Sequence, residues 1–544
     1  MDRRDKSIVL ALIGLLVITS VAAVLAESGE PSAAPAFGGS YVEGVAGVAQ
    51  DLNPLLATTN VDQDVARLAF AGLTRFDRSG AVVPDLADRF DVDADGLRWT
   101  FVLREAYWHD GQRVVADDVV YTVGLVQDRA YVGPYAEAFR GVTVQRVDAR
   151  TVRFTLPDAY GPFAASTTLP LLPSHMLGGV AYAELARTTF SQRPIGTGPF
   201  RVAEVDGRQI VLSRHERFHR AQPARSRPYL DRLILRFYRD TGEALVALAR
   251  GEIDGTAGLD AIDAERARGL KNVNLYSLPT NDFTALFLNV RSEKAIFRDR
   301  AVRQAMALAI DRGRVLQIAA DGRGRVADEF VPPTSWAYSR DVRRYQHNAS
   351  EAKALLDEAD WKDHDGDGTR DKGGAALAFT LTTSDEPTRV LAASHIASDL
   401  VAIGMRVELR TVGFAELVDR VARDRAFDVI LVGITAGNEP DPYAFFHSSQ
   451  AKDPGYNFSG YSTLPLDRAL EQARRTYDQA KRAELYAQAF QIIANDVPVI
   501  YLYFSDYLYA QHRSVNGIKI APITDPTQRF WDVEDWYMRT QPRQ

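Results

Sequence analysis

The sequence contains no cysteine, and this absence narrows the classes of protein it can encode. It excludes disulfide bonds, thiol catalysis and cysteine-ligated metals, and also a lipid-modified N-terminal cysteine. A concentrated basic surface is absent as well, because acidic residues outnumber basic ones by 71 to 64, the net charge is −7 and the basic residues are scattered. A nucleic-acid partner is therefore not expected.

Long apolar runs are also absent, with one exception at the start of the chain. After "MDRRDK", residues Ser7 to Ala26 carry no charge. From Ile8 this run has 19 residues, and at ~1.5 Å per residue a helix of that size approaches the thickness of a bilayer core. The basic flank predicts a cytoplasmic N-terminus. Residues 1–26 are thus either a membrane anchor, which the length favours, or a signal peptide ending in "VLA".

Both alternatives make the rest of the chain extracytoplasmic: held at the membrane by the N-terminal helix, or released after signal cleavage. Residues 27–40 are small, polar and rich in proline and glycine, which is typical of a tether. We expect the folded body to begin near Tyr41.

The remaining chain is large enough to fold into two or more lobes. Strand-like and helix-like patterns alternate along it, and there is no internal repeat. A single amphipathic helix is predicted over 297–320, one or two helices over 465–496, and a tyrosine-rich strand directly afterwards. The predicted fold class is α/β with mixed sheets.

Three short motifs suggest chemistry. The first, "HERFH", has His215, Glu216 and His219 in the H-E-x-x-H pattern of zinc peptidases. That pattern needs a helix to bring both imidazoles to one face. The preceding "RQIVLSR" alternates as a strand does, and prolines follow. We therefore interpret the motif as a polar strand exit, with a zinc-dependent peptidase as the alternative.

The second motif, "DHDGDGTRDKGG", resembles a calcium loop. Asp363, Asp365 and Asp367 stand at the first ligand positions and Gly368 at the turn position, but Gly374 replaces the final acid. We expect a solvated hairpin in which glycines supply positive φ angles, with weak calcium binding as the alternative. No metal or cofactor is predicted.

The third motif, "RPIGTGPFRV", contains G-x-G, but a proline and a strand follow where a dinucleotide-binding loop would enter a helix. We expect a rigid turn. No serine–histidine–acid set stands out among the nine histidines, so nothing in the sequence requires an enzyme.

Taken in order, longer motifs form a recognisable series. It begins with "DLNPLLAT", "GLTRFDRSGAVVPDLADRF" and "DGLRWTFVLREAYWHDGQRVVADDVVYTV", continues with "RPIGTGPFRV", "RPYLDRLILRFY" and "FRDRAVRQAMALAIDR", and ends with "FDVILVGITAGNEPDPYAFFHSSQ" and "DVPVIYLYF". Over residues 41–535 this series resembles the extracellular solute-binding proteins of family 5. That family serves ATP-driven (ABC) importers of dipeptides, oligopeptides, nickel complexes and some sugars.

The resemblance implies a two-lobed periplasmic-binding-protein fold of type II, closing on its ligand about hinge strands. Lobe I is expected to take residues 41–278 and 506–540, with an extra subdomain over 62–190, and lobe II residues 279–505.

The same resemblance implies a candidate site. In peptide-binding relatives an aspartate just before a D-P pair binds the peptide's amino terminus. Here that loop reads "AGNEPDP", so the nearest residues are Gly437, Asn438 and Glu439. Glu439 would supply the charge, whereas a neutral Asn438 would suit a sugar. Asp441 is expected to shape the turn.

Other candidates come from outside that loop. Trp336 and Tyr338 would line side-chain pockets or belong to the core, and Asn289 would lie near the hinge and face the cleft. Residues 44–50, with Gly47 and Ala49, would either offer backbone for strand addition to an extended ligand or form a plain strand.

The function predicted from these observations is binding without bond chemistry. A monomer would capture peptides and deliver them to ABC permease subunits. The alternatives are an oligosaccharide or another polar solute as the ligand, a sensor that presents its ligand to a membrane kinase, and the zinc-dependent peptidase.

Overall fold

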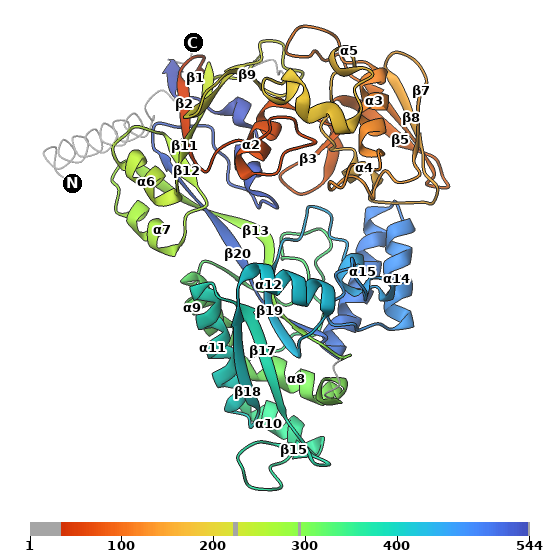
Figure 1. The fold of residues 1–544 in the computed structure, drawn as a ribbon, viewed down its shortest axis with the longest axis vertical. Coiled ribbons are helices and arrows are strands. Elements are labelled where there is room, and N and C mark those ends of the chain that lie inside the picture. Colours follow the sequence, from red (N-terminus) through yellow and green to blue (C-terminus); the bar gives the residue numbers. More distant parts are fainter. Residues whose placement is uncertain (1–33, 221–226, 292–294, 542–544) are drawn as a thin grey trace, which may run out of the picture.

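A computed structural model describes residues 34–220, 227–291 and 295–541. The predicted anchor and the first half of the tether lie outside these residues. Two lobes lie one above the other in Figure 1 and are joined by two long strands, β13 (Val273–Leu288) and β20 (Val499–His512). Lobe I, at the top, holds the chain before β13 and after β20, and lobe II holds the chain between them.

The two crossing strands form the centre of a continuous sheet. Its order is β18-β17-β19-β13-β20-β12-β2-β11-β10-β9, with β14 also paired to β20. β13 and β20 are antiparallel, and their register shifts between Pro279 and Phe283. Because proline lacks a backbone N–H, the ladder is interrupted there. The sheet can therefore change direction between the lobes.

In lobe I the strands surround the first strand of the predicted body. β2 (Ser40–Ala46) pairs in parallel with β11 (Arg232–Tyr238) on one side and with β12 (Gly255–Ala257) on the other. β9 (Phe200–Val205) and β10 (Gln209–Arg214) complete this half of the sheet, and α6 (Thr241–Ala249) and α7 (Ala261–Arg268) belong to the same lobe.

The folded part begins earlier than expected. β1 (Ala34–Ala36) pairs with β21 (Arg539–Gln541), so part of the predicted tether is a strand. The C-terminal segment is fixed to lobe I by charge. The guanidinium of Arg529 donates to both carboxylate oxygens of Asp64 at 2.7 and 2.5 Å, and to Glu43 at 2.9 Å. Such a bidentate arrangement compensates buried charges that would otherwise destabilise the fold.

A separate four-stranded sheet forms the extra part of lobe I, with strand order β5-β6-β8-β7. Aromatic side chains hold it to the neighbouring helices, and Trp99, Phe101, Phe154 and Phe163 are all fully buried there. Its elements and those beside it are β3 (Thr74–Phe76), β4 (Val82–Pro84), β5 (Ala87–Val92), β6 (Arg98–Leu103), β7 (Thr143–Arg146), β8 (Thr151–Thr155), α2 (Asn60–Ala69), α3 (Ala116–Val126), α4 (Phe163–Ser166) and α5 (Ser174–Leu177).

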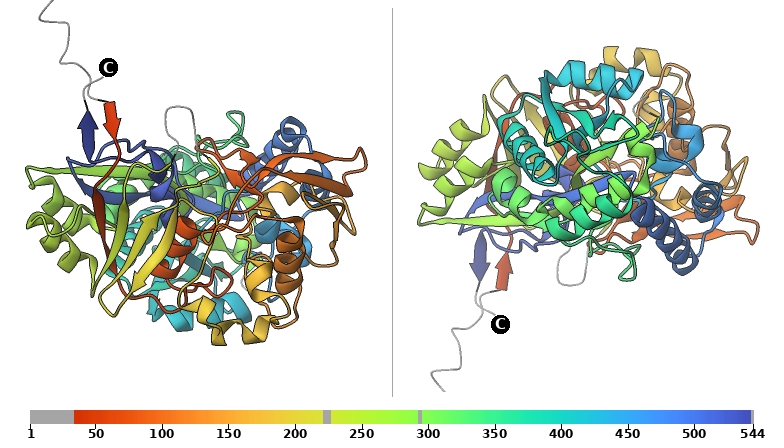
Figure 2. Two further views of the ribbon diagram at one scale, coloured as in Figure 1. Left: turned by 90° about the horizontal axis from the view of Figure 1, so that it is seen from above. Right: turned by 90° about the horizontal axis from the view of Figure 1, so that it is seen from below.

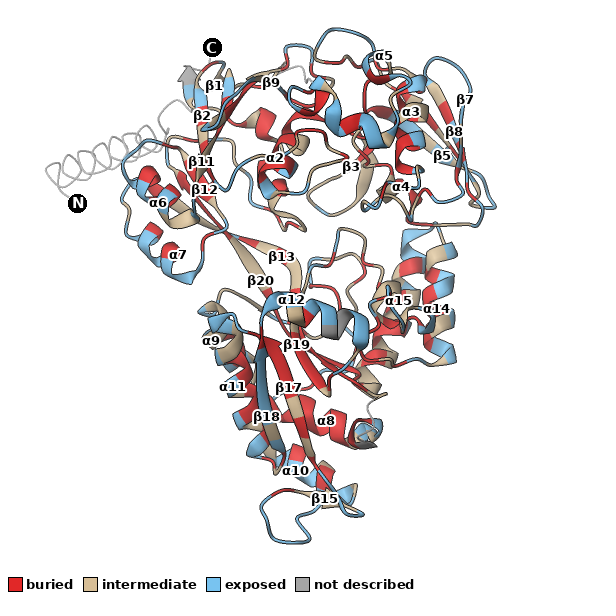
Figure 3. Cartoon of the chain, in the orientation of Figure 1, coloured by how far each residue is buried: buried red, intermediate tan, exposed pale blue. Residues whose placement is uncertain are grey.

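Lobe II packs helices against its half of the sheet, whose inner strands are largely buried and whose edge strand is mostly exposed (Figure 3). Its strands are β14 (Gly324–Val326), β15 (Asp371–Lys372), β16 (Ala375–Ala376), β17 (Ala378–Ser384), β18 (Arg406–Val412) and β19 (Val429–Ile434). Its helices are α8 (Arg300–Ala309), α9 (Arg312–Ala320), α10 (Ala349–Glu358), α11 (Pro387–Val401), α12 (Phe414–Leu417), α13 (Tyr443–Phe446), α14 (Leu464–Arg475) and α15 (Gln479–Asp496). In the views from above and below, one lobe lies behind the other, because these views look along the direction that joins the lobes (Figure 2).

One predicted helix is divided in the structure, so this prediction is wrong. The helix expected over 297–320 is two helices, α8 and α9, which meet at Ile310 and Asp311. The side chain of Asp311 accepts a hydrogen bond from the backbone N–H of Arg314 and so starts a new helix. Aspartate at such a position competes with helix continuation by capping the next turn.

Candidate ligand-binding site between the lobes

The lobes touch beside the crossing strands. Oδ1 of Asn438, in the loop after β19, accepts a hydrogen bond from Nε2 of Gln528 at 3.0 Å and another from the hydroxyl of Thr524. Asn438 belongs to lobe II, and the other two belong to the C-terminal segment of lobe I. The predicted loop therefore does face the opposite lobe. Gly437 beside it is exposed, and the side chain of Asn438 is used for the contact between lobes.

A second contact lies between the extra sheet and the helices of lobe II. The N–H of Gly161 donates to the carbonyl oxygen of Arg474 at 2.7 Å. A Cβ atom at Gly161 would lie 1.9 Å from the carbonyl oxygen of Thr476, so only glycine fits. Nearby, the rings of Trp99 and Tyr477 meet edge to face at 5.2 Å. The two contacts bring the lobes together at two separate places.

Aromatic and charged side chains face one another between the lobes. Burial and, to a smaller extent, the negative charge of Asp441 in lobe II raise the pKa of the Tyr160 phenol to about 12. Tyr507, on β20, likewise has its pKa raised to about 12 by burial. Such phenols remain neutral at physiological pH and offer both a hydrogen-bond donor and an apolar face.

The charged residues of the predicted loop are already paired within lobe II. Asp441 accepts a hydrogen bond of 2.5 Å from Nε of Arg474 and another of 3.0 Å from the N–H of Tyr443, which starts α13. Glu439 forms an ion pair with Arg482. The guanidinium of Arg482 also lies 5.0 Å from the ring centre of Trp336. The charge of Glu439 is thus compensated before any ligand arrives.

The remaining predicted residues lie apart from the contact. Trp336 and Tyr338 are half-buried against the core of lobe II, and the hydroxyl of Tyr338 accepts a hydrogen bond of 2.8 Å from Arg344. Asn289 is only 5% exposed and lies at the lobe II end of β13. Its Nδ2 donates to the carbonyl oxygens of Phe427 and Arg425, so the expectation that it lies near the hinge and faces the cleft is wrong.

Residues 44–50 were expected to offer free backbone groups for strand addition, and only part of this stretch could do so. β2 ends at Ala46 and lies between two other strands, so its own residues are not an edge strand. Gly47 follows with a positive φ of 95° and donates its N–H to Tyr238. Ala49 packs against the core of lobe I. The stretch bends away after the strand because glycine tolerates this backbone conformation.

One acid that the sequence did not single out lies on the crossing strand itself. Asp282 stands in the register shift of β13 and is half-buried. Its Oδ1 is buried and has no hydrogen-bond partner among the described residues. Burial raises its pKa to about 6, a hydrogen bond with the Thr435 side chain opposes this shift, and the charge of Asp525 adds to it.

The H-E-x-x-H motif does not form the helix that a zinc site of this pattern needs. β10 ends at Arg214 and the motif forms turns, as predicted from the strand pattern. Nδ1 of His215 lies 3.1 Å from the carbonyl oxygen of Gly198, and Nε2 of His219 lies 2.7 Å from a carboxylate oxygen of Asp85. Glu216 bonds Arg214. The two imidazoles are therefore used for separate structural contacts.

The G-T-G motif is a close packing point, which confirms the expected turn. A Cβ atom at Gly196 would lie 1.8 Å from the carbonyl oxygen of Ala69, at the end of α2, and Gly198 donates its N–H to the same oxygen at 2.9 Å. These glycines allow the loop to approach the helix end directly.

The aspartate loop lies at the end of lobe II that is farthest from lobe I, near β15 (Figure 1). Oxygen atoms of Asp363, Asp365 and Asp371 lie within 4.8 Å of one another. The oxygens of Asp371 bond the backbone N–H and Nδ1 of His364 in the same loop. Both oxygens of Asp363 accept backbone N–H groups of the loop's own glycines, Gly366 and Gly368. The loop is thus an ordered, exposed hairpin.

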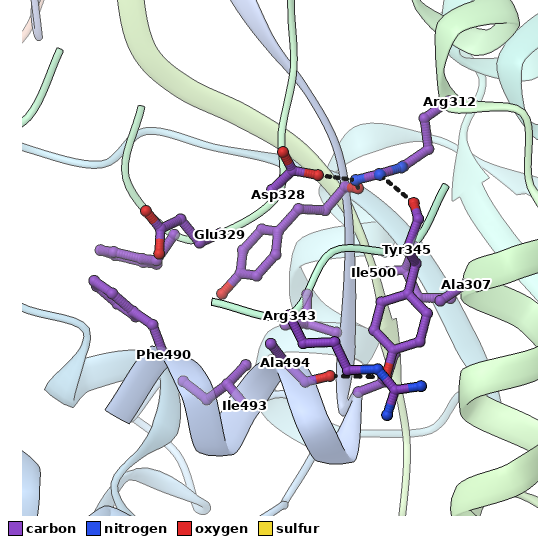
Figure 4. A pocket seen from close by; sticks show the side chains of 14 residues that line it. Ala307, Arg312, Asp328, Glu329, Arg343, Tyr345, Phe490, Ile493, Ala494 and Ile500 are labelled. Carbon is purple, nitrogen blue, oxygen red and sulfur yellow. Dashed lines mark hydrogen bonds and ion pairs between the residues drawn. The ribbon is translucent and has the colours of Figure 1, made fainter. Parts of the chain in front are cut away.

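A small pocket lies within lobe II (Figure 4) and has a volume of about 30 Å³. This is enough for roughly one water molecule and far too small for a peptide. Glu329 lines it and is 2% exposed, and burial raises its pKa to about 8. Its carboxyl group is therefore mostly protonated at neutral pH. All the residues that line this pocket belong to lobe II, so it is separate from the contacts between the lobes.

These features define a class of protein: a two-lobed binding protein of the periplasmic type II fold, with its candidate site between lobes joined by crossing strands. The profile of the bacterial extracellular solute-binding proteins, family 5 (middle), matches residues 81–457. The chain belongs to this family, whose members are extracytoplasmic binding proteins.

Relatives support the assignment over nearly the whole length. The oligopeptide-binding protein AppA of Bacillus subtilis is 30% identical over 518 residues, which are 93% of this chain and 92% of that protein. The di/tripeptide-binding protein 1 of Pseudomonas aeruginosa is 27% identical, covering 86% of this chain and 90% of the other.

Solved structures agree. AppA from Bacillus subtilis in complex with a nonapeptide matches with a TM-score of 0.71 and 29% identity, over 93% of this chain and 100% of that one. NikZ from Campylobacter jejuni in complex with Ni(L-His) matches with a TM-score of 0.73 and 26% identity, over 92% and 99%. Within the part of the chain that the structure describes, no helix combines the length and the apolar character needed to span a bilayer.

Proposed function

We propose that this protein is the substrate-binding component of an ABC importer, which captures peptides between its lobes and delivers them to the permease. The observation that carries the proposal is the pair of contacts between lobes, at Asn438 and at Gly161, on either side of facing aromatic and charged side chains. The relatives named for oligopeptides and for di- and tripeptides support a peptide as the ligand. The nonapeptide complex of AppA supports it further.

The mechanism is hinge closure. Lobe I would comprise residues 41–278 and 506–540, with the extra subdomain within 62–190, and lobe II residues 279–505. The register shift of β13 falls at this boundary, where a change in backbone angles disturbs few ladder hydrogen bonds. A ligand favours the closed form only through contacts that it makes better there than in the open form.

The candidate loop would act in two ways. Asn438 would hold the lobes together, and Gly437 and the backbone beside it would face the ligand. Glu439 and Asp441 would keep the loop in shape through Arg482 and Arg474. Trp336 would then border the ligand's side chains from lobe II. Gly47 and Ala49 would offer backbone groups beyond the end of β2.

The protein would work outside the cytoplasm as a monomer. Residues 1–26, which lie outside the described residues, would hold it at the membrane or be removed as a signal peptide. The closed form would dock on the permease subunits. Neither step needs bond chemistry.

Mass spectrometry of ligand carried through purification tests the proposal, together with small-angle scattering before and after adding short peptides. Co-purifying peptides and a smaller radius of gyration on peptide addition are the expected results. If a saccharide or another non-peptide solute is retained, the ligand is not a peptide, but hinge closure remains the proposed mechanism. Scattering curves and melting temperatures that no candidate solute changes would refute the proposal.

A further inference from the structure

Asp282 lies on the strand that connects the two lobes. It lies in the register shift where β13 passes from one lobe to the other. On one side, Thr435 belongs to the same loop as Asn438, and on the other, Asp525 belongs to the same segment as Gln528. The two loops that make the contact between lobes therefore both reach this carboxylate.

The C-terminal segment is fixed beside it by the backbone. The N–H of Ile523 donates to the carbonyl oxygen of Pro279 at 2.7 Å, and Thr280 bridges to Ile523. These bonds hold Asp525 near the crossing strand. Asp282 is thus approached from lobe I by a second acid, and from lobe II by an exposed hydroxyl-bearing residue, Thr435.

Among the described residues, no cation compensates Asp282. Its pKa responds to burial, to the Thr435 side chain and to Asp525, and only the hydroxyl stabilises the charged form. Asp525 differs, because it lies near a cation: burial lowers the pKa of the Arg67 guanidinium, and the charge of Asp525 opposes this shift, as expected for an attractive pair. The acids of the predicted loop in lobe II are also compensated: Glu439 by Arg482 and Asp441 by Arg474.

A half-buried carboxylate without a counter-charge costs free energy in the ligand-free protein. That cost is relieved if the missing cation arrives with the ligand. The position fits this explanation, because a cation held there would contact the crossing strand and lie against loops from both lobes. It would therefore favour the closed arrangement over the open one.

We propose that Asp282 is the anchor for an ammonium group of the ligand, either the amino terminus of a peptide or a lysine side chain. This inference rests on the proposed peptide-binding function and adds the ligand charge that the site selects. It places the anchor on the hinge strand, and not on the loop acid Glu439 that the sequence suggested.

The test uses the purified protein and a mixture of short synthetic peptides in three forms: with a free amino terminus, N-acetylated, and N-acetylated with one lysine. Retained peptides are identified by mass spectrometry and their affinities measured by calorimetry. For the wild type we expect peptides with an ammonium group to bind roughly 10- to 150-fold more tightly than fully blocked ones, the range for hydrogen bonds to charged groups. The first and third forms, each compared with the fully blocked second form, show whether the site prefers the amino terminus or the lysine side chain.

Asp282→Asn keeps the shape of the side chain and removes its charge, so it should abolish this preference. Asp506→Asn is the matched control, since Asp506 also lies on a crossing strand but has Arg325 as an attractive charge. The control should keep the preference. Equal binding of blocked and unblocked peptides, or an unchanged preference in Asp282→Asn, overturns the inference and leaves the function intact. Retention of no peptide by the wild type overturns both.

Discussion

Nε2 of Gln528 donates a hydrogen bond of 3.0 Å to Oδ1 of Asn438, and the two residues belong to different lobes. They are 90 positions apart in the sequence. The bond lies beside the crossing strands, so it forms only when the lobes approach. It is therefore part of the free-energy difference between the closed and the open arrangement.

Asn438→Ala should weaken ligand binding by roughly 2- to 12-fold, the worth of one net hydrogen bond of about 0.5–1.5 kcal/mol. The effect should stay in this range because Gln528 Nε2 also donates to the hydroxyl of Thr524 at 2.9 Å, and so keeps a partner. Calorimetry with a bound peptide measures it. The exposed Asn272→Ala serves as the control, and equal affinities for the two variants would contradict the assignment.

Gly161→Ala should impair closure without harming the fold of either lobe. In the closed arrangement the new methyl group would lie 1.9 Å from the carbonyl oxygen of Thr476, a distance that no Cβ atom tolerates. We expect ligand affinity to fall by at least about tenfold, while the melting temperature of the ligand-free protein stays unchanged. Scattering should show a smaller compaction on adding peptide.

Gly207→Ala is the matched control for that experiment, because nothing lies within 4 Å of a Cβ atom built there. If Gly161→Ala binds and compacts like the control, the second contact between lobes does not belong to the ligand-bound state.

Asp282→Asn should make the ligand-free protein more stable near neutral pH. The folded protein raises the pKa of Asp282 to about 6, above its value of 3.8 in a free chain. An acid whose pKa is raised by folding destabilises the fold increasingly as pH rises from the lower value through the higher one. Allowing for solvent at its exposed side, the gain is roughly 1 kcal/mol and 1–2 °C in melting temperature.

Thermal melts of wild type and Asp282→Asn over a range of pH measure this effect. The difference should be present near neutral pH and vanish below about pH 3, where Asp282 is neutral in both the folded and the unfolded wild type. If the difference in melting temperature is the same at both pH values, the stabilisation comes from packing and not from the removed charge.

His219→Ala should destabilise lobe I, whereas Glu216→Gln should not. Burial alone would raise the pKa of Asp85, but Arg220 and His219 lower it below its ordinary value. Removing His219 leaves this buried carboxylate with less compensation and should cost roughly 2–4 kcal/mol. Glu216 is about half exposed, with 54% of its side chain accessible, and it pairs with Arg214 and Arg227.

Thermal melts distinguish the two variants, and metal analysis adds a second readout. A zinc peptidase would lose peptide cleavage in Glu216→Gln and bound zinc in His219→Ala. Cleavage of peptides by the wild type that disappears in Glu216→Gln would therefore contradict the structural interpretation of this motif.

Local patterns were informative wherever neighbours in the sequence decide the structure. The strand before His215, the strand at 499–512 and the turn at Gly196 and Gly198 are all confirmed. The break between α8 and α9 was missed because the apolar face continues across it. The capping carboxylate of Asp311 was the signal that could have revealed it.

Local sequence patterns predicted less of the candidate site than of the fold. The loop at Asn438 was found through the family resemblance, and it does reach the other lobe. Its acids, however, are compensated by arginines from α14 and α15, and no local pattern shows such a pairing. Asp282 gave no signal in the sequence beyond being an acid within a strand of apolar character.

The sequence by itself determined the order of the elements, the family and the absence of thiol chemistry, since periodicity and composition act over short distances along the chain. Only the tertiary structure decided which carboxylates are left without a counter-charge. Charge compensation depends on distance in space, and the partners here, such as Glu439 and Arg482, are 43 positions apart. Folding brings them together and leaves Asp282 beside another acid.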